Sequence, residues 1–304
     1  MRLQPKPIVN RREAYFVGLI ILAAAIFYRP LWIVAGSSFS VDQYSQVLVV
    51  PPLSILLLYM EKKKIFAQTS FSQAGIVLYV VFIGVFAYLA RNAEAMDASN
   101  YIALSILLFT ACCIAAFLFS YGSRALQAGA FPVFFLILMT PLPDSLRNQV
   151  ITFLQYGSAD VTDWLFTASG IPFTRAGVIL SLPTVTIEIA QECSGIRSSL
   201  ILVISGLILG HLFLRSGWSK LALLILLIPF TIIKNGIRIF TLSTLGMYVN
   251  PSFLTGRLHH EGGIVFFALA LACVWVAIWL LQKVENAIMR NDLRETSRDV
   301  VVPS

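Results

Sequence analysis

Charged residues are scarce in this sequence. Only 12% of its 304 residues are charged and 58% are apolar, whereas a soluble domain carries about 25% charged residues. This deficit excludes an ordinary soluble fold, because most of the chain must be surrounded by lipid. The net charge of +7 does not indicate a nucleic-acid partner, since the basic residues lie between the apolar runs and do not cluster in one module.

Cysteine and histidine are scarce as well, with four and three residues. No CxxC pair and no Cys/His spacing indicates zinc or a disulfide framework, so we predict no metal and no cofactor. Cys112, Cys113 and Cys273 lie inside apolar runs, where a cysteine usually acts as a small buried or lipid-facing residue. Cys193 alone has polar neighbours.

Long apolar runs are abundant. A helix needs about 20 apolar residues to cross the hydrocarbon core, and the candidates are about 14–35, 43–60, 73–90, 99–120, 125–143, 195–214, 219–246 and 261–283. We therefore predict an all-α membrane protein, a polytopic bundle of about eight transmembrane helices. The first run lacks a clear cleavage site and is interpreted as a membrane helix, not a signal peptide. Residues 1–284 would form one integral membrane domain, and 285–304 a polar, disordered tail.

Lysine and arginine set the predicted orientation. If there are eight spans, the basic groups before the first span, in three alternate loops and after the last span all lie on one side. By the positive-inside rule that side is the cytoplasm, so both termini are predicted to be cytoplasmic. The residues concerned are Arg2, Lys6, Arg11, Arg12, Lys62, Lys63, Lys64, Arg124, Arg215, Lys220, Lys283, Arg290, Arg294 and Arg298.

The opposite face then holds one sizeable region outside the membrane, from about 142 to 194. Apolar residues recur at helical spacing from 148 to 168, which is typical of an amphipathic helix that lies on the membrane or caps the bundle. Residues 185–189 alternate between apolar and polar, as in a strand. With a weaker alternation before Pro183, they predict a short β-hairpin that turns at Pro183 and leads straight into Cys193.

Reactive side chains gather where this region meets the sixth apolar run, in Gln191-Glu192-Cys193-Ser194-Gly195-Ile196-Arg197-Ser198. Ionisable groups at the edge of a bilayer are costly and usually functional. Cys193 is therefore the first candidate for a nucleophile, because a nearby imidazole or guanidinium favours the reactive thiolate.

Two basic residues interrupt the seventh run. Lys234 and Arg238 are four residues apart and share a helix face. At 1.5 Å per residue, Arg238 lies about 27 Å beyond Lys220, near the predicted depth of Cys193. The commoner role for Lys234 would be to extend to the lipid headgroups, whereas the neighbouring Asn235 favours a packed polar site around Arg238.

His259 and His260 stand at the predicted outer start of the eighth run. An exposed pair at such a place is often only a solvated helix end. Histidine can also protonate a leaving amine, and arginine can stabilise a thiolate or an oxyanion. Cys193, Arg238 and a histidine together are sufficient for acyl transfer through a thioester.

Three motifs follow one another on this multi-pass chain: Glu192-Cys193-Ser194-Gly195-Ile196-Arg197, then Asn235-Gly236-Ile237-Arg238, then a histidine followed by glycine and two phenylalanines. Over roughly residues 40–275, the sequence resembles the exosortase/archaeosortase family of membrane cysteine enzymes. The resemblance implies that Cys193 is the nucleophile, that Arg238 is the arginine of a triad, and that His259 is its histidine, with His260 as the alternate. Supporting residues would be Arg197, Glu192 and Asn235.

The resemblance implies a cysteine protease or transpeptidase of the PEP-CTERM protein-sorting type, in the bacterial inner membrane. Its substrates would be membrane-anchored exported proteins with a C-terminal sorting signal, which consists of a short motif, a transmembrane helix and a basic tail. The active site would lie on the periplasmic face, and the acyl group would pass to water or to an envelope acceptor.

Two other functions stay open. A transporter could line an anion pathway with Lys234 and Arg238, although these charges lie toward one face and the sequence shows no internal repeat. A non-catalytic assembly factor for envelope polysaccharide export would need Cys193 only as a structural residue.

Overall fold

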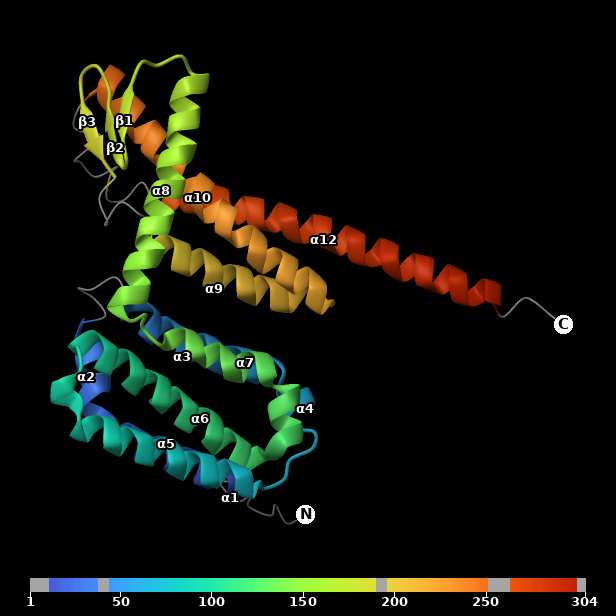
Figure 1. Cartoon of the computed structure of the whole chain (residues 1–304). Helices are drawn as coiled ribbons and strands as arrows, with labels where there is room; N and C mark the ends of the chain where they lie inside the picture. The colour runs from blue at the N-terminus through green and yellow to red at the C-terminus, as the bar shows by residue number, and fades with distance from the viewer. Residues whose placement is uncertain (1–10, 38–43, 190–195, 251–262, 300–304) are drawn as a thin grey trace, which may run out of the picture. The chain divides into compact units, whose positions relative to one another are not determined.

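The computed structural model describes residues 11–37, 44–189, 196–250 and 263–299. Nearly all of its elements are helices, and its one sheet has three short strands (Figure 1). Contacts divide the chain into two compact units, Met1–Arg147 and Asn148–Ser304. Each unit has its own hydrophobic clusters.

Four of the described helices are long and apolar enough to cross a membrane: α5 (Gln73–Arg91), α6 (Ala98–Ala128), α10 (Gly217–Tyr248) and α12 (Gly263–Asp299). Two bent pairs raise this number to six if each is one span. They are α1 (Arg11–Ile26) with α2 (Tyr28–Ser37), bent by 79°, and Ala130–Met139 with α8 (Asp144–Ala168), bent by 94°. The helical multi-pass membrane protein predicted from the sequence is confirmed.

The predicted count of eight spans stays a prediction. The two remaining apolar runs correspond to α3 (Ser45–Met60) and α9 (Ile196–Phe213). Both helices are shorter than the roughly 20 residues that a span needs. The fifth run is also divided, into α7 (Ala130–Phe135) and the 3₁₀ helix η3 (Leu136–Met139).

The first unit is organised around α6, against which α1 and α5 pack. Phe27 stacks on Phe86 with ring centroids 3.9 Å apart, and Cys112 is fully buried in the same cluster. Cys113 is half-buried and Cys273 of the second unit is exposed, as predicted for cysteines in apolar runs. Two short elements, α4 (Lys62–Ile65) and η2 (Ala93–Ala95), complete this unit.

Gly122 interrupts α6 with a φ of 87°. The backbone N–H groups of Ser70 and Ser72 donate to the carbonyls of Tyr121 and Phe119 beside this break. A Cβ on Gly122 would lie 2.6 Å from the carbonyl oxygen of Ser70. Only glycine fits here, because the position combines a left-handed φ with close backbone contact.

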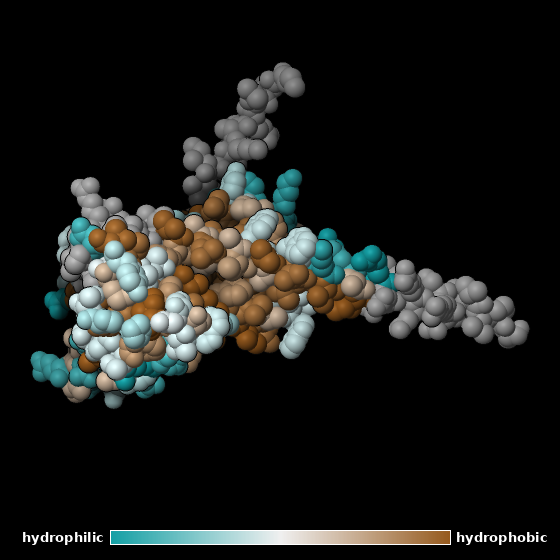
Figure 2. All heavy atoms as spheres, turned by 90° about the horizontal axis from the view of Figure 1, so that it is seen from above, coloured by the Kyte–Doolittle hydropathy of each residue, from teal (hydrophilic) through white to brown (hydrophobic). Residues whose placement is uncertain are grey.

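The second unit has a layer of three helices, α9, α10 and α12, around a shared apolar cluster that includes Leu202, Leu223 and Val274. Figure 2 shows apolar side chains along these helices, with polar side chains at both ends of the band. At one end, Glu285 of α12 accepts hydrogen bonds from the backbone N–H groups of Arg215 and Ser216, just before α10 begins. α12 stays helical through Asp299, so it includes most of the segment predicted as a tail.

The sheet of the second unit contains β1 (Thr174–Ala176), β2 (Ile179–Ser181) and β3 (Thr186–Glu188), all antiparallel. Ser181 pairs with Thr186, so the predicted hairpin with Pro183 at its turn is confirmed. β1 lies in the stretch 170–189 that the sequence indicates as extended, but it is not predicted as a separate strand, because Thr174-Arg175-Ala176 show no apolar alternation.

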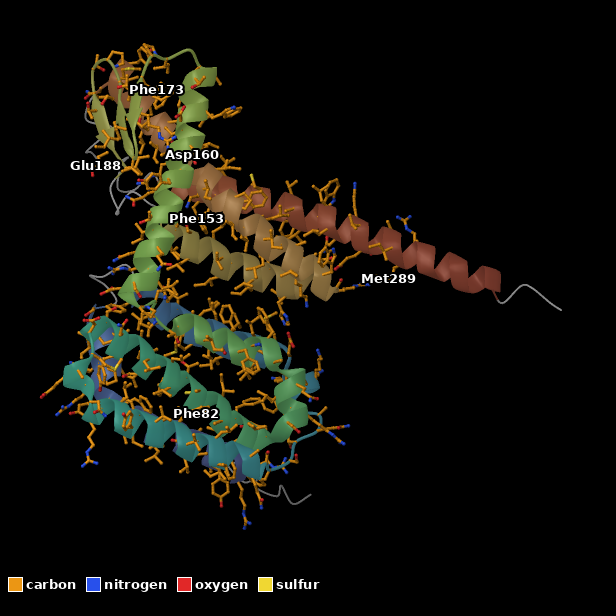
Figure 3. The ribbon with its side chains drawn as sticks, viewed as in Figure 1. Phe82, Phe153, Asp160, Phe173, Glu188 and Met289 are labelled. Carbon is orange, nitrogen blue, oxygen red and sulfur yellow. The ribbon has the colours of Figure 1, made fainter. Side chains whose placement is uncertain are left out.

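α8 is the amphipathic helix that the sequence predicted, but only part of its apolar stripe packs against the rest of the protein. Phe153 and Trp164 belong to that stripe and are 57% and 68% exposed. Figure 3 shows Phe153 on α8. The buried face carries the small or polar residues Ser158, Ala159 and Thr162 among the large apolar Ile151, Leu154 and Phe166. Small side chains let two helices approach closely, and this face meets α10.

Candidate active site

α10 changes its packing partners along its length. In its first half, Leu223 and Leu227 join the cluster with α9 and α12. In its second half, Ile239 joins a cluster with Phe166 of α8 and Leu180 of the sheet. The change takes place at Lys234-Asn235-Gly236-Ile237-Arg238, which is the basic motif found in the sequence.

Asn235 and Gly236 form the crossing between α10 and α8. The Asn235 side chain is 1% exposed, and its Nδ2 donates to Ser158 Oγ at 3.0 Å. A Cβ on Gly236 would lie 2.5 Å from Val161 Cγ1, so the absence of a side chain permits the close approach. Thr162 Oγ1 donates to the Ser158 carbonyl at 2.7 Å and lies 3.3 Å from the Gly236 carbonyl. The first half of the motif therefore fixes one helix against another.

Lys234 joins α10 to α9. Its side chain is 4% exposed, and its Nζ donates to Ser198 Oγ at 2.5 Å. The interpretation that Lys234 extends to the lipid headgroups is therefore wrong. The ammonium turns inward because Ser198, in the first turn of α9, offers it a hydroxyl acceptor.

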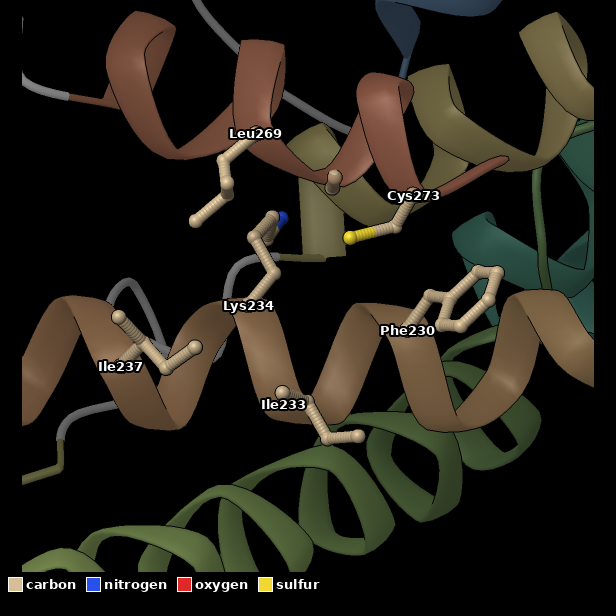
Figure 4. A pocket seen from close by; sticks show the side chains of 7 residues that line it. Phe230, Ile233, Lys234, Ile237, Leu269 and Cys273 are labelled. Atoms are coloured by element: carbon tan, nitrogen blue, oxygen red, sulfur yellow. The ribbon is translucent and has the colours of Figure 1, made fainter. Parts of the chain in front are cut away.

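A small pocket of about 40 Å³ lies between α10 and α12 beside this lysine (Figure 4). Apart from Lys234 its lining is apolar or thiol: Phe230, Ile233, Ile237, Leu269, Ala270 and Cys273. In the close view the sulfur of Cys273 points toward the Lys234 side chain. The pocket thus lies within one to two helical turns of Arg238, which is half-buried on the same helix.

The sheet end that leads toward Cys193 is held by α8. Ile189 is 1% exposed, its N–H donates to the Val178 carbonyl at 3.0 Å, and its own carbonyl accepts from Gln155 Nε2 at 2.6 Å. Gln155 lies three residues before Ser158, so it is one turn from the α8–α10 crossing.

The chain around Cys193 is consequently anchored on both sides. Glu192 and Cys193 themselves lie outside the described residues, as do His259 and His260. Arg197 is in the first turn of α9, and its side chain lies outside the described part. Of the predicted site residues, the structure describes the side chains of Asn235 and Arg238, both on α10.

The sequence was compared with models of protein families, with curated proteins and with solved structures. The family model of transmembrane exosortases matches residues 32–276, which is most of the chain. The chain belongs to the transmembrane exosortase family. No curated protein and no solved structure matched. The matched range contains both motifs and the helices that carry them, so these anchors belong to the exosortase region.

Sequence reasoning missed four residues of this exosortase that build the anchors: Gln155, Ser158 and Thr162 on α8, and Ser198 on α9. Their signal was present, because residues 155, 158 and 162 follow a helical spacing and are all polar. A polar stripe on a helix next to a reactive motif indicates a buried contact with another polar element. The prediction for this helix used its apolar residues instead, and these indicated the other face.

Ion pairs between side chains attach the sheet of the exosortase to α8. Arg175 on β1 pairs with Asp160 at 2.7 Å and with Asp163 at 3.1 Å. Figure 3 shows Asp160 on α8 and Glu188 on the sheet. Burial lowers the pKa of Arg175, but the hydrogen bonds that the guanidinium donates to both carboxylates outweigh this effect and raise the pKa above its ordinary value. Arg175 therefore stays charged throughout the physiological range, and both ion pairs lie outside the apolar core.

Proposed function

We propose that this exosortase is a membrane cysteine protease or transpeptidase that cleaves the C-terminal sorting signals of exported proteins. The observation that carries the proposal is the pair of anchors around Cys193. Ile189, four residues before it, is held by Gln155 of α8, and Ser198, five residues after it, is held by Lys234 of α10. A segment of four or five residues reaches at most about 14–18 Å.

The two anchors lie on joined helices. Asn235 binds Ser158, so α8 and α10 cross between the anchor points, and Arg238 follows within one turn of Asn235. We infer that a nucleophile between these two anchors lies in the neighbourhood of a guanidinium. This supports the assignment of Cys193 and Arg238 to one site.

The proposed reaction uses the thiolate of Cys193. Its sulfur attacks the carbonyl carbon of the scissile peptide bond, and Arg238 stabilises the negative charge that forms on the carbonyl oxygen. His259, or its alternate His260, accepts the thiol proton and donates it to the amine that leaves. Water or an envelope amine then attacks the thioester carbonyl, the acyl group is released, and the thiolate returns.

Supporting roles follow from position. Asn235 donates from its amide to Ser158, so we assign it the role of holding α10 in place. Glu192 and Arg197 flank the nucleophile in the sequence and are proposed to set its electrostatic surroundings. No metal or organic cofactor takes part in the proposed steps.

The proposed topology has eight spans and both termini in the cytoplasm of a bacterium, with the active site on the outer face of the inner membrane. Besides four to six spans, the structure has apolar helices α3 and α9 at the two other predicted runs. The family match runs through both compact units, which supports one integral membrane domain. The partners would be the lipid bilayer and membrane-anchored substrates, not nucleic acid.

Replacement of Cys193 tests the proposal. Cys193→Ala should abolish the shortening of a tagged substrate that ends in a motif, an apolar helix and basic residues. Cys113→Ala, a cysteine in the other unit, should leave it intact. Immunoblots of the substrate tag measure both.

Continued shortening in Cys193→Ala cells would refute the protease assignment. Intact processing with a loss of solute uptake would favour a transporter. Intact processing with a loss of surface polysaccharide would favour an assembly factor.

A further inference from the structure

Basic side chains from separate segments of the first unit meet at one end of it. Arg12, at the start of α1, donates from Nη1 to Thr69 Oγ1. Arg124, near the end of α6, donates from Nη1 to Gln68 Oε1 at 2.9 Å. Gln68 and Thr69 are neighbours in the loop between α4 and α5. Two guanidiniums that are far apart in the sequence therefore lie on one short loop.

Backbone hydrogen bonds fix this loop to α6. The N–H groups of Ser70 and Ser72 donate to the carbonyls of Tyr121 and Phe119, at 3.1 Å each, beside the break of the helix at Gly122. The loop residues that accept from the two arginines are thus held in place by the fold, so the guanidiniums are positioned before any ligand binds.

The described part of the chain does not balance the charge of the two arginines. Their acceptors are a hydroxyl and an amide oxygen, both neutral, and the ion pairs among the described residues use other arginines. A guanidinium has five N–H donors, so each keeps donors for a further ligand. The same segments carry more exposed cations than acidic residues, and this end of the unit should attract anions. The cations are Arg11, Lys62, Lys63 and Lys64, and the acidic residues are Glu13 and Glu61.

Exposed aromatic side chains lie beside these cations. The guanidinium of Arg12 lies over the Phe71 ring, 5.1 Å from its centroid, and the Lys62 ammonium lies over the Tyr59 ring at 3.8 Å. Both rings are exposed, as is the ring of Tyr15, which contacts Phe71 edge to face. Exposed aromatic residues next to cations are typical of the headgroup level of a membrane, where an amphipathic ring meets both lipid and water.

An apolar helix surface begins directly after this cluster. α5 starts two residues after Phe71, and its Val77, Val80 and Val81 are exposed. Figure 1 shows the start of α5 close to α1 at the same end of the unit. A ligand that fits both features has an anionic head and apolar chains. A nucleic acid or an acidic peptide would use the cations and leave the apolar surface uncovered.

We propose that the start of α1, the loop at 66–72 and the end of α6 form a binding site for an anionic phospholipid. Arg12 and Arg124 donate to oxygens of its headgroup phosphate, the lysines of α4 add attraction, and the acyl chains lie along α5. The proposal goes beyond the proposed function and does not depend on it, because no step of the cleavage reaction enters it.

Lipid binding to the purified full-length protein in a neutral detergent tests this site. Native mass spectrometry measures the affinities for phosphatidylglycerol, which is anionic, and for phosphatidylcholine, which is zwitterionic. We expect phosphatidylglycerol to bind at least about tenfold more tightly, and Arg12→Gln with Arg124→Gln to weaken its binding at least about tenfold. As a control, Arg215→Gln with Arg290→Gln removes the same charge from exposed positions of the second unit. This control should change the affinity less than about twofold.

A second variant keeps the test valid if the loss of the arginine bonds prevents folding. Lys63 and Lys64 are both exposed on α4, so Lys63→Gln with Lys64→Gln should leave the unfolding temperature unchanged. It should still weaken phosphatidylglycerol binding at least about threefold. Wild-type lipid affinity in this lysine variant would overturn the proposal.

Equal affinities for the two lipids would also overturn it, as would equal losses in the arginine variant and its control. Two competitors separate the remaining ligand classes. Displacement of the lipid by millimolar inorganic phosphate would assign the site to a free anion. Tighter binding of a polyglutamate peptide than of phosphatidylglycerol would assign the surface to an acidic protein. Either result would refute the lipid site and leave the proposed function untouched.

Discussion

At the scale of single residues, the anchors of the candidate site are few and specific. Gln155 and Lys234 each use one polar group to hold a chain segment next to Cys193. Such bonds contribute about 1 kcal/mol each to stability. Their larger effect should be on function, because a shift of about 1 Å in a reacting group can cost 100-fold in rate.

Gln155→Ala should lower the turnover of a sorting-signal substrate at least about tenfold and change the unfolding temperature little. The reason is that Ile189, and with it the segment before Cys193, loses its link to α8. A matched control is Gln282→Ala, which removes the same kind of bond, from a glutamine Nε2 to the Phe213 carbonyl at 3.0 Å, away from the site. Cleavage kinetics with purified protein measure the effect. Equal losses in both variants would contradict a positioning role for Gln155.

At the scale of elements, the crossing of α8 and α10 decides where the motif lies. The apolar run at 219–246 predicted α10 closely, since the helix extends from Gly217 to Tyr248. The helix at 148–168 and the hairpin at Pro183 were predictable too, because periodicity is local. The pairing of Asn235 with Ser158 was not, because the two residues are 77 positions apart and no local pattern links them.

Gly236→Ala should destabilise the protein by about 1–3 kcal/mol, because the added methyl group would overlap Val161 and force the helices apart. Val161→Ala should recover part of this loss, since it removes the opposing atoms. The control is Gly84→Ala in α5, where a Cβ meets nothing within 4 Å. Thermal unfolding in detergent measures the wild type, the two single variants, the double variant and the Gly84→Ala control. Strictly additive effects of Gly236→Ala and Val161→Ala would argue against direct contact.

At the scale of the whole molecule, the charge pattern and the helices together predict the topology. We expect the cytoplasm to contain the lysine-rich segment Lys62-Lys63-Lys64 and the C-terminal end of the chain. The helix–sheet region, which consists of α8 and the three-stranded sheet, should lie outside. The described helices account for four to six spans, so the side on which each loop lies depends on whether α3 and α9 also cross.

Reporter fusions can decide this topology. Alkaline phosphatase fused after Gly170 should be active, because the enzyme matures only outside the cytoplasm. The same reporter after Lys64 or after Ser304 should be inactive, whereas green fluorescent protein at these two positions should fluoresce. An inactive phosphatase at Gly170 would place the helix–sheet region inside and would contradict a site on the outer face.

The sequence by itself determined the class of this protein and predicted the residues of its candidate site. Apolar runs reveal membrane helices because each run is continuous along the chain, and the motifs around Cys193 and Arg238 stand out because polar residues are costly beside lipid. The family match over 32–276 agrees with the resemblance that these motifs carry.

Only the tertiary structure decided what Lys234 contacts and what packs against the small residues of α8. Sequence reasoning favoured a lysine that extends to the headgroups, but Ser198, 36 residues away, turns its ammonium inward. The apolar stripe of α8 also predicted that Phe153 and Trp164 pack, whereas Ser158 and Thr162 are the residues that face the core. In both cases the partner comes from another helix, and a hydrogen bond or a close contact between distant residues depends on packing that no local pattern records.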